Sequence, residues 1–343
     1  MTGPIVIAHR GMPGERLEHT RASYELAVAA GCDYIEPDVV ATGDGHLVVR
    51  HENEIGHTTD VADHPEFAER RTTKFVNGVP RTGWFTEDFT LAEIKTLTTS
   101  ERLPQLRPQN IGLAGVEPVL TLDEVIAIAR AGGVGVYVET KLPSYFRRLG
   151  LDLDDLLLET LQRHDLNRVD ADVPVIVQSF ETSNLQGLRD RTPLPLVQLI
   201  DRQGAPWDFV VRRDRRTYAS LTSKRELSRI AEYADGIGPN KSLVIRRDRD
   251  YRLTHETKLV RRAHQRGLMV HIWTMRDENN FLPTNLRLGP DVAAHGDARA
   301  EYLAFYAAGV DGTFSDFTRT ALAAREEWLR SPTPTGRSGA PSA

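Results

Sequence analysis

The chain has 343 residues, of which 40% are hydrophobic and 27% are charged, and its formal net charge is −5 with a pI near 6.1. This acidic balance argues against the broad basic surface that nucleic acids select, and no apolar run is long enough to be an integral membrane segment. We therefore expect a soluble protein that acts on a small molecule and has no nucleic-acid partner. Nothing in the sequence predicts its oligomeric state.

The length and the two termini predict the domain organisation. Barrels of alternating strands and helices reach this length as one domain, so we expect a single catalytic domain over 1–330. Residues 331–343 are poor in apolar side chains and predict a disordered tail. No basic segment followed by an apolar stretch opens the chain, which predicts a cytoplasmic protein; a chain trimmed of such a leader would instead be secreted or periplasmic. Cys32 is the only cysteine, so no intrachain disulfide can form.

The first predicted elements are a strand and a helix. Residues 4–8 are continuously apolar and end at His9-Arg10-Gly11, and the pattern of 21–30 predicts a helix that Gly31 ends.

The stretch 34–51 predicts a strand followed by a hairpin. Four turn residues, 42–45, separate two β-branched runs, so the second run returns antiparallel to the first. Glu36 and Asp38 lie two apart in the first run and should face the same side, and the return strand should bring His51 toward them.

Residues 52–120 are longer and less periodic than a simple crossover, and we interpret them as an inserted cap beside the site. Thr90-x-x-Glu93 predicts a short helix inside this region. Thr121-x-x-Glu124 predicts the start of the next helix, because both are capping boxes.

The rest of the chain alternates regularly between strands and helices. We expect further parallel strands at 134–141, 173–180, 194–200, 234–239, 268–275 and 310–316. We expect helices at 153–164, 183–190, 223–233, 255–265, 298–308 and 319–329, and a long polar loop at 201–222. With the first two strands this makes eight parallel strands, which predicts a (β/α)8 TIM barrel with the cap inserted between strands 2 and 3.

Active sites of such barrels lie at the carboxyl ends of the strands. The polar residues expected there are His9, Arg10, Glu36, Asp38, Glu139, Lys141, Gln178, Trp273 and Asp316. Three converging acids, Glu36, Asp38 and Glu139, predict a site for one hard divalent cation, Ca²⁺ or Mg²⁺. Arg10 and Lys141 beside that cation describe a phosphoryl pocket.

Histidines are the natural proton carriers at such a pocket, and His9 and His51 are the candidates. The remaining histidines noted in the chain are interpreted as structural or solvated: His46, His57, His64, His264 and His271.

These motifs, in this order and spacing, resemble the glycerophosphodiester phosphodiesterase family. The resemblance is carried by His9-Arg10-Gly11, Glu36-x-Asp38, the turn at 42–45 with LVVRH, Glu139-Thr-Lys141, Gln178-Ser-Phe180, Trp273-Thr and VDGTFSD. It implies that Glu36, Asp38 and Glu139 hold the metal, that His9 and His51 are general acid and base, and that Arg10 and Lys141 contact the phosphate. Gln178 and Trp273 would bind the substrate, with Trp273 beside the glycerol.

The long cap resembles the calcium-using bacterial branch, which makes Ca²⁺ the expected ion and Mg²⁺ the second choice. Two positions depart from the family pattern: the family's Pro-Glu-Asn-Thr reads Leu17-Glu18-His19-Thr20, and its His-Asp reads His51-Glu52. Three alternatives remain open. One is a lysophospholipase D or sphingomyelinase D-like enzyme with a lipid substrate; the others are an enolising metal-dependent lyase and a non-catalytic phosphoester-binding protein.

Overall fold

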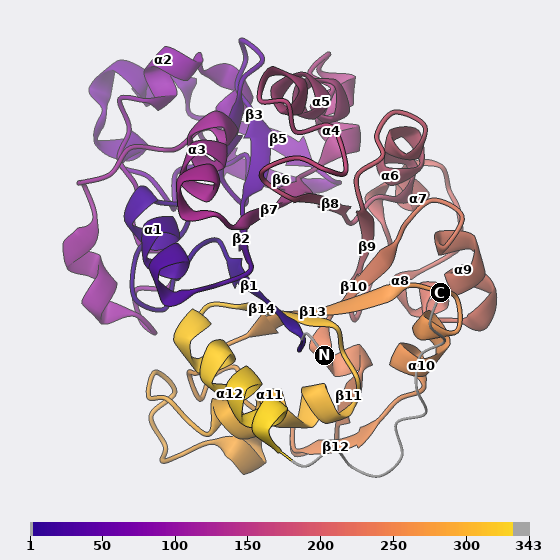
Figure 1. Cartoon of the computed structure of the whole chain (residues 1–343). Coiled ribbons are helices and arrows are strands. Elements are labelled where there is room, and N and C mark those ends of the chain that lie inside the picture. The colour runs from indigo at the N-terminus through magenta and orange to yellow at the C-terminus, as the bar shows by residue number, and fades with distance from the viewer. Residues whose placement is uncertain (1–2, 332–343) are drawn as a thin grey trace.

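The predicted parallel strands close into a ring in the computed structural model of the chain, which describes residues 3–331 (Figure 1). The ring strands are β1 (Ile5–His9), β2 (Tyr34–Glu36), β7 (Gly135–Thr140), β8 (Val175–Ser179), β9 (Leu196–Ile200), β10 (Gly236–Pro239), β13 (Met269–Met275) and β14 (Gly312–Ser315). Every neighbouring pair is parallel, β1 pairs with β14, and β2 pairs with β7. The TIM barrel predicted from the sequence is confirmed.

A helix follows each ring strand and packs on the outside of the ring (Figure 1). These helices are α1 (Arg21–Ala30), α3 (Leu122–Gly132), α5 (Leu153–Arg163), α6 (Thr182–Arg189), α9 (Lys224–Ile230), α10 (Leu259–His264), α11 (Ala298–Ala307) and α12 (Thr318–Arg330). Both ends of α1 are capped locally: Thr20 accepts from the Ser23 amide, and Gly31 adopts φ of 96°, the left-handed conformation that glycine allows.

The predicted hairpin is present, with one break in its first strand. β2 ends at Glu36, and after Pro37 the chain resumes as β3 (Asp38–Ala41), which pairs parallel with β7 and antiparallel with β4 (Leu47–Val49). Pro37 has no amide hydrogen to donate, which accounts for the interruption.

Residues 52–120 contain only short elements. They are the hairpin β5 (Thr72–Val76) and β6 (Val79–Gly83), the helix α2 (Leu91–Ile94), and the 3₁₀ helices η1 (Val61–Asp63), η2 (Pro65–Arg70), η3 (Thr86–Asp88) and η4 (Pro108–Leu113). Both predicted capping boxes, at Thr90 and Thr121, are formed.

The structure corrects two predictions. The segment 201–222 is not only loop, because it contains α7 (Trp207–Val211) and α8 (Tyr218–Leu221); a capping box between Thr217 and Ser220 begins α8. The helix predicted at 255–265 begins only at Leu259, because the residues before it form a hairpin of β11 (Ile245–Arg247) and β12 (Leu253–Glu256). Elements this short do not produce a readable period.

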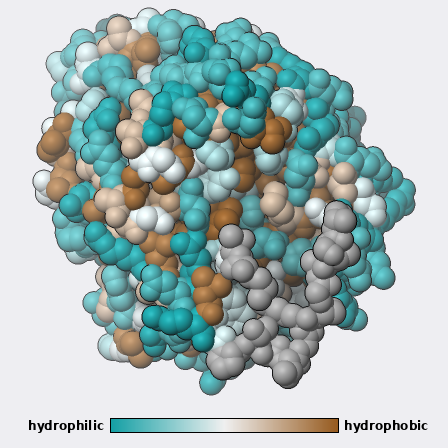
Figure 2. All heavy atoms as spheres, in the orientation of Figure 1, coloured by the Kyte–Doolittle hydropathy of each residue, from teal (hydrophilic) through white to brown (hydrophobic). Residues whose placement is uncertain are grey.

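Three further short helices connect the main elements: α4 (Pro143–Arg148), η5 (Lys241–Leu243) and η6 (Thr284–Leu286). Within residues 3–331, no helix combines the length and the apolar character that a bilayer span requires. In the view of Figure 2, hydrophilic residues cover most of the described surface, with apolar residues scattered among them. The predicted tail, 331–343, lies outside the described residues except for Ser331.

An apolar plug fills the inside of the ring. It consists of Ile7, Tyr137, Ile176, Val197 and Phe314, against which Tyr34 and Trp273 pack. A separate and larger core lies between the strands and the outer helices. The plug closes the ring from within, so a cavity can open only above or below it.

Candidate active site

The predicted site residues stand directly above the plug. On four strands the residue two positions earlier belongs to the plug or packs on it: Ile7 before His9, Tyr34 before Glu36, Tyr137 before Glu139 and Ile176 before Gln178. Side chains alternate along a strand, so both members of each pair face the interior. The plug is therefore the floor of a site at the carboxyl ends of the strands.

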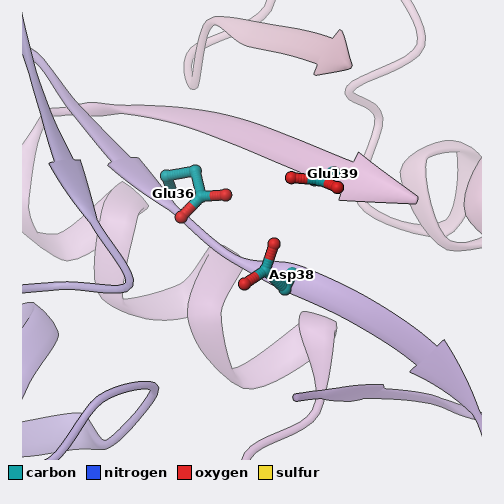
Figure 3. Close-up of side chains that lie close together, drawn as sticks. All are labelled: Glu36, Asp38 and Glu139. Carbon is teal, nitrogen blue, oxygen red and sulfur yellow. The ribbon is translucent and has the colours of Figure 1, made fainter. Parts of the chain in front are cut away.

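Three buried carboxylates converge above this floor. One oxygen each of Glu36, Asp38 and Glu139 lies within 4.8 Å of the other two, and Figure 3 shows the carboxyl groups turned toward a common space. Glu36 ends β2, and Asp38 begins β3 in register with Glu139 on β7. Glu36 and Asp38 thus face the same side, as their spacing predicts.

Two buried cations lie against this triad. The Nζ of Lys141 is 2.5 Å from Oε1 of Glu139 and 3.0 Å from Oδ1 of Asp38. The Nε of Arg10 is 3.1 Å from Oδ2 of Asp38. Buried charges are costly unless paired, and here each cation contacts at least one of the acids.

Glu36 is held by neutral donors instead. The backbone amide of Arg10 donates to its Oε2 at 2.9 Å, and the side-chain amide of Gln178 donates to its Oε1 at 3.2 Å. Within residues 3–331, Oε1 of Gln178 accepts no hydrogen bond. Gln178 therefore orients Glu36 in this structure.

The triad carries more negative charge than its surroundings neutralise. Burial raises the pKa of Glu36 well above its ordinary value, and the nearby Asp38 and Glu139 raise it further. Burial also raises the pKa of Glu139 to about 7, although Lys141 opposes the shift. For Asp38, Lys141 and Arg10 together outweigh burial and hold the pKa low. A bound divalent cation would relieve this repulsion, so the donor set fits a hard metal ion.

The imidazole of His9 is oriented by Asp316. Its Nδ1 lies 2.6 Å from Oδ1 of Asp316, which is in turn held by Arg107 and Arg276, each 2.6 Å from Oδ2. Within the described chain no hydrogen bond reaches Nε2 of His9. The Nε2 nitrogen is therefore available to exchange a proton with a molecule bound in the cavity that His9 lines.

His51 has a similar partner. Its Nδ1 lies 2.5 Å from Oε1 of Glu52, and Oε2 of Glu52 is 2.7 Å from Arg102. The antiparallel β4 returns His51 to the cavity that Glu36 also lines, as predicted.

Both histidines are uncharged at neutral pH in this structure. Burial lowers the pKa of His9 to about 4 with help from Arg10, although Asp316 opposes the shift. Burial, Arg10 and Lys141 lower the pKa of His51 to about 3. Each ring can therefore accept a proton.

A cavity of about 790 Å³ contains these groups. Its lining includes His9, Arg10, Glu36, His51, Glu139, Lys141, Gln178 and Trp273. Eight of the ten residues predicted for the site thus share one cavity. Of the other two, Asp38 contacts Arg10 and Lys141, and Asp316 contacts His9.

The family can now be assigned. The sequence model of the glycerophosphoryl diester phosphodiesterase family matches residues 9–320. This chain belongs to that family. The match spans every residue of the triad and both histidines, and the resemblance seen in the sequence is confirmed.

Curated relatives of the chain carry the same family name. The glycerophosphodiester phosphodiesterase GDPD6 of Arabidopsis thaliana is 37% identical over 96% of this chain and 88% of its own length. A glycerophosphodiester phosphodiesterase of Bacillus subtilis is 32% identical over 80% of this chain and 77% of its own.

Solved structures with the same fold include two proteins at low sequence identity. A glycerophosphoryl diester phosphodiesterase from Silicibacter pomeroyi superposes with a TM-score of 0.67 at 20% identity, covering 97% of this chain and 96% of that one. A phosphodiesterase from Oleispira antarctica, solved with its product sn-glycerol-3-phosphate, superposes with a TM-score of 0.63 at 21% identity, covering 94% and 97%.

Membership in the phosphodiesterase family sets aside the enolising lyase, and it shows the chain to be a phosphoric diester hydrolase. The two departures from the family pattern both lie at the site. His19, in place of an asparagine, places Nε2 3.0 Å from Oδ2 of Asp38, and Glu52, in place of an aspartate, holds His51.

The sequence analysis placed Asp316 at a strand end without assigning it a role, and it did not predict Glu52 and His19 as functional residues. The available signal for Glu52 and His19 was their departure from the family motif.

Proposed function

We propose that this chain hydrolyses glycerophosphodiesters, such as glycerophosphocholine and glycerophosphoethanolamine, to sn-glycerol 3-phosphate and an alcohol, with one divalent cation bound. The observation that carries the proposal is the meeting of a carboxylate triad, two cations and two histidines at one cavity of a member of this phosphodiesterase family.

Glu36, Asp38 and Glu139 would hold the cation, and Ca²⁺ is the proposed ion, with Mg²⁺ second. All three ligands are hard oxygens, and their spread of up to 4.8 Å is within the roughly 5 Å that two oxygens on one Ca²⁺ can span. When bound, the cation would supply positive charge against the phosphate and acidify a neighbouring hydroxyl group. The triad, the two cations and a divalent ion together leave one positive charge, which matches a phosphodiester monoanion.

Arg10 and Lys141 would contact the phosphate, because both are fixed cations that line the cavity beside the triad. Trp273 would border the glycerol. Its indole N–H donates to the Gly238 carbonyl at 2.7 Å, which holds the ring at the cavity wall.

The two histidines would move the protons. One, uncharged, accepts the proton of the glycerol hydroxyl next to the phosphoester as that oxygen attacks phosphorus. The other has to begin this step protonated, a form that the negative charge of a bound phosphodiester favours, and it donates that proton to the departing alcohol. The product of this step is a cyclic phosphate. Water then opens the ring as the two histidines exchange roles, so both return to their initial states and no side chain becomes covalently modified.

A lipid substrate is a second candidate, favoured by exposed apolar residues near the site. Phe75 and Val79 on the β5–β6 hairpin are 69% and 48% exposed, and Val210 and Val211 on α7 are also exposed. The hairpin turn lies against α7: a Cβ added at Gly78 would meet the Trp207 ring at 2.8 Å. This rim could admit the acyl chain of a lysophospholipid.

The deciding experiment measures choline release from glycerophosphocholine by the protein with Ca²⁺, with Mg²⁺ and with EDTA. We expect release with Ca²⁺, less with Mg²⁺ and none with EDTA. Lysophosphatidylcholine is assayed in parallel, and a higher kcat/KM for it would favour the lipid candidate. Absence of release from both esters under all conditions would overturn the proposal.

A further inference from the structure

A second cavity, of about 580 Å³, adjoins the active-site cavity. The two share a wall formed by His51, Glu139, Lys141 and Phe180. A substrate whose phosphate lies at this wall can therefore extend into both.

The two cavities differ in charge. We call the basic lobe the part of the first cavity lined by Lys241, Arg246, Arg247, Arg249, Arg276 and Arg287. We call the acidic lobe the part of the second lined by Phe180, Glu181, Asp201, Trp207 and Tyr218. Trp273, proposed to border the glycerol, lines the first cavity, which leaves the acidic lobe for the alcohol.

We propose that the acidic lobe binds a cationic alcohol headgroup, an ammonium or quaternary ammonium group, and so selects amino-alcohol esters among glycerophosphodiesters. This inference rests on the proposed function and adds the substrate class and the residues that recognise it.

Glu181 and Asp201, the two acids of the acidic lobe, have no ion-pair partner within the described residues. Glu181 is only 3% exposed. Glu181 accepts hydrogen bonds from the backbone and hydroxyl of Ser144, and Asp201 accepts one from the Arg202 amide. Burial raises the pKa of Glu181 to about 7, and an incoming cation would favour its charged form.

The cations that share this cavity are mostly neutralised already. Lys141 contacts two acids of the triad, and Arg102 contacts Glu18 and Glu52. Arg81 lies on the exposed strand β6 at the margin. The net field inside the acidic lobe therefore favours a positive group. In the basic lobe Lys241, Arg247 and Arg276 are paired with acids, but Arg246, Arg249 and Arg287 form no ion pair within residues 3–331 and would repel such a group.

Aromatic rings complete the lobe. Phe180 and Tyr218 meet edge to face with centroids 5.9 Å apart, and Trp207 lines the same cavity. Aromatic rings attract cations through their negative faces, and they provide the apolar contact that a methylated ammonium needs. Lys141 already lies over the Phe180 ring, 5.8 Å from its centroid, so Trp207 and Tyr218 are the rings offered to an incoming cation. Carboxylates beside aromatic rings suit this headgroup better than a neutral glycerol or an anionic one.

The test compares choline with 3,3-dimethylbutanol, its uncharged isostere, by calorimetric titration of the full-length, Ca²⁺-loaded protein. We expect choline to bind about tenfold more tightly. Glu181→Gln and Asp201→Asn should each remove most of this difference. The matched control is Asp172→Asn, because this exposed acid precedes β8 at the opposite end of the strand from Glu181 and should leave the ratio unchanged.

The kinetic arm compares kcat/KM for the glycerophospho esters of the same two alcohols. Preference for the choline ester, lost in Asp201→Asn, supports the inference even if Glu181→Gln fails to fold. The inference would be overturned if choline and 3,3-dimethylbutanol bound equally well and their glycerophospho esters had equal kcat/KM. The proposed function would still stand in that case. Selective binding of choline without hydrolysis of either ester would instead support the lobe and overturn the proposed function.

Discussion

The Nδ1 of His9 lies 2.6 Å from Oδ1 of Asp316, although the two residues are 307 positions apart in the chain. Pairing of β1 with β14, which places Ala8 opposite Ser315, brings them together. Asp316 accepts a hydrogen bond from Nδ1–H of His9. The unprotonated Nε2 is then available to a molecule bound in the cavity. The contact fixes the tautomer and the orientation of a proposed proton carrier.

Replacement of Asp316 by asparagine should lower kcat by roughly 10–10²-fold with little change in KM, because His9 loses its orienting partner. Since the negative charge of Asp316 raises the pKa of His9, the variant should also shift the NMR titration of His9 to lower pH. Glu326→Gln, on the exposed face of α12, is the control. An unchanged His9 titration together with normal kcat would remove Asp316 from the mechanism.

His9→Ala and His51→Ala should each reduce turnover by ~10²–10⁴-fold, the usual contribution of a general acid or base. Because neither residue belongs to the carboxylate triad, stabilisation by Ca²⁺ should persist in both variants. The control is His46→Ala, on an exposed turn. A histidine variant with near-normal turnover would exclude that residue as a proton carrier.

Ca²⁺ should stabilise the fold by about 2.7 kcal/mol at a hundredfold excess over its dissociation constant, because the ion relieves repulsion among the triad acids. Thermal melting should show a Tm increase of a few degrees that EDTA reverses. In Glu139→Gln the increase should shrink or vanish. If EDTA changes neither Tm nor activity of the Ca²⁺-loaded protein, the triad is not a metal site.

Substrates that lack the glycerol hydroxyl next to the phosphoester should bind without reacting, because that hydroxyl is the proposed nucleophile. Competition against glycerophosphocholine measures the binding, and phosphorus NMR follows the reaction. A cyclic glycerophosphate should form early from the true substrate. Rapid hydrolysis of the deoxy compound would identify water as the nucleophile.

Stability should fall in acid partly because of His271. This ring is buried in the barrel with Nδ1 3.0 Å from the Tyr137 hydroxyl, and burial lowers its pKa from 6.5 to about 4. Between these pH values the unfolded chain binds the proton and the folded chain does not, so the free energy of unfolding decreases as pH falls through this window, by on the order of 3 kcal/mol for this residue.

Denaturant unfolding at several pH values measures this dependence. His271→Gln should flatten the slope of unfolding free energy against pH between about 4 and 6.5, whereas His46→Gln should not. An unchanged slope in His271→Gln would mean that the ring is charged in the folded state.

Local patterns in the sequence were sufficient to predict the barrel and the polar side chains that meet at the carboxyl ends of its strands. The order of the eight strands, the capped helices and the alternation that aims Glu36 and Asp38 to one side all depend on neighbours within a few residues. Short-range periodicity and capping encode such features directly.

Only the tertiary structure decided the partners of these residues. The contact of His9 with Asp316, the pairing of Lys141 with both Asp38 and Glu139, and the acidic lobe all join segments that ring closure brings together. The short helices α7 and α8, which contribute Trp207 and Tyr218 to that lobe, were also not predicted from the sequence. Their conformations depend on packing over the strand ends, and a sequence window does not contain the residues they pack against.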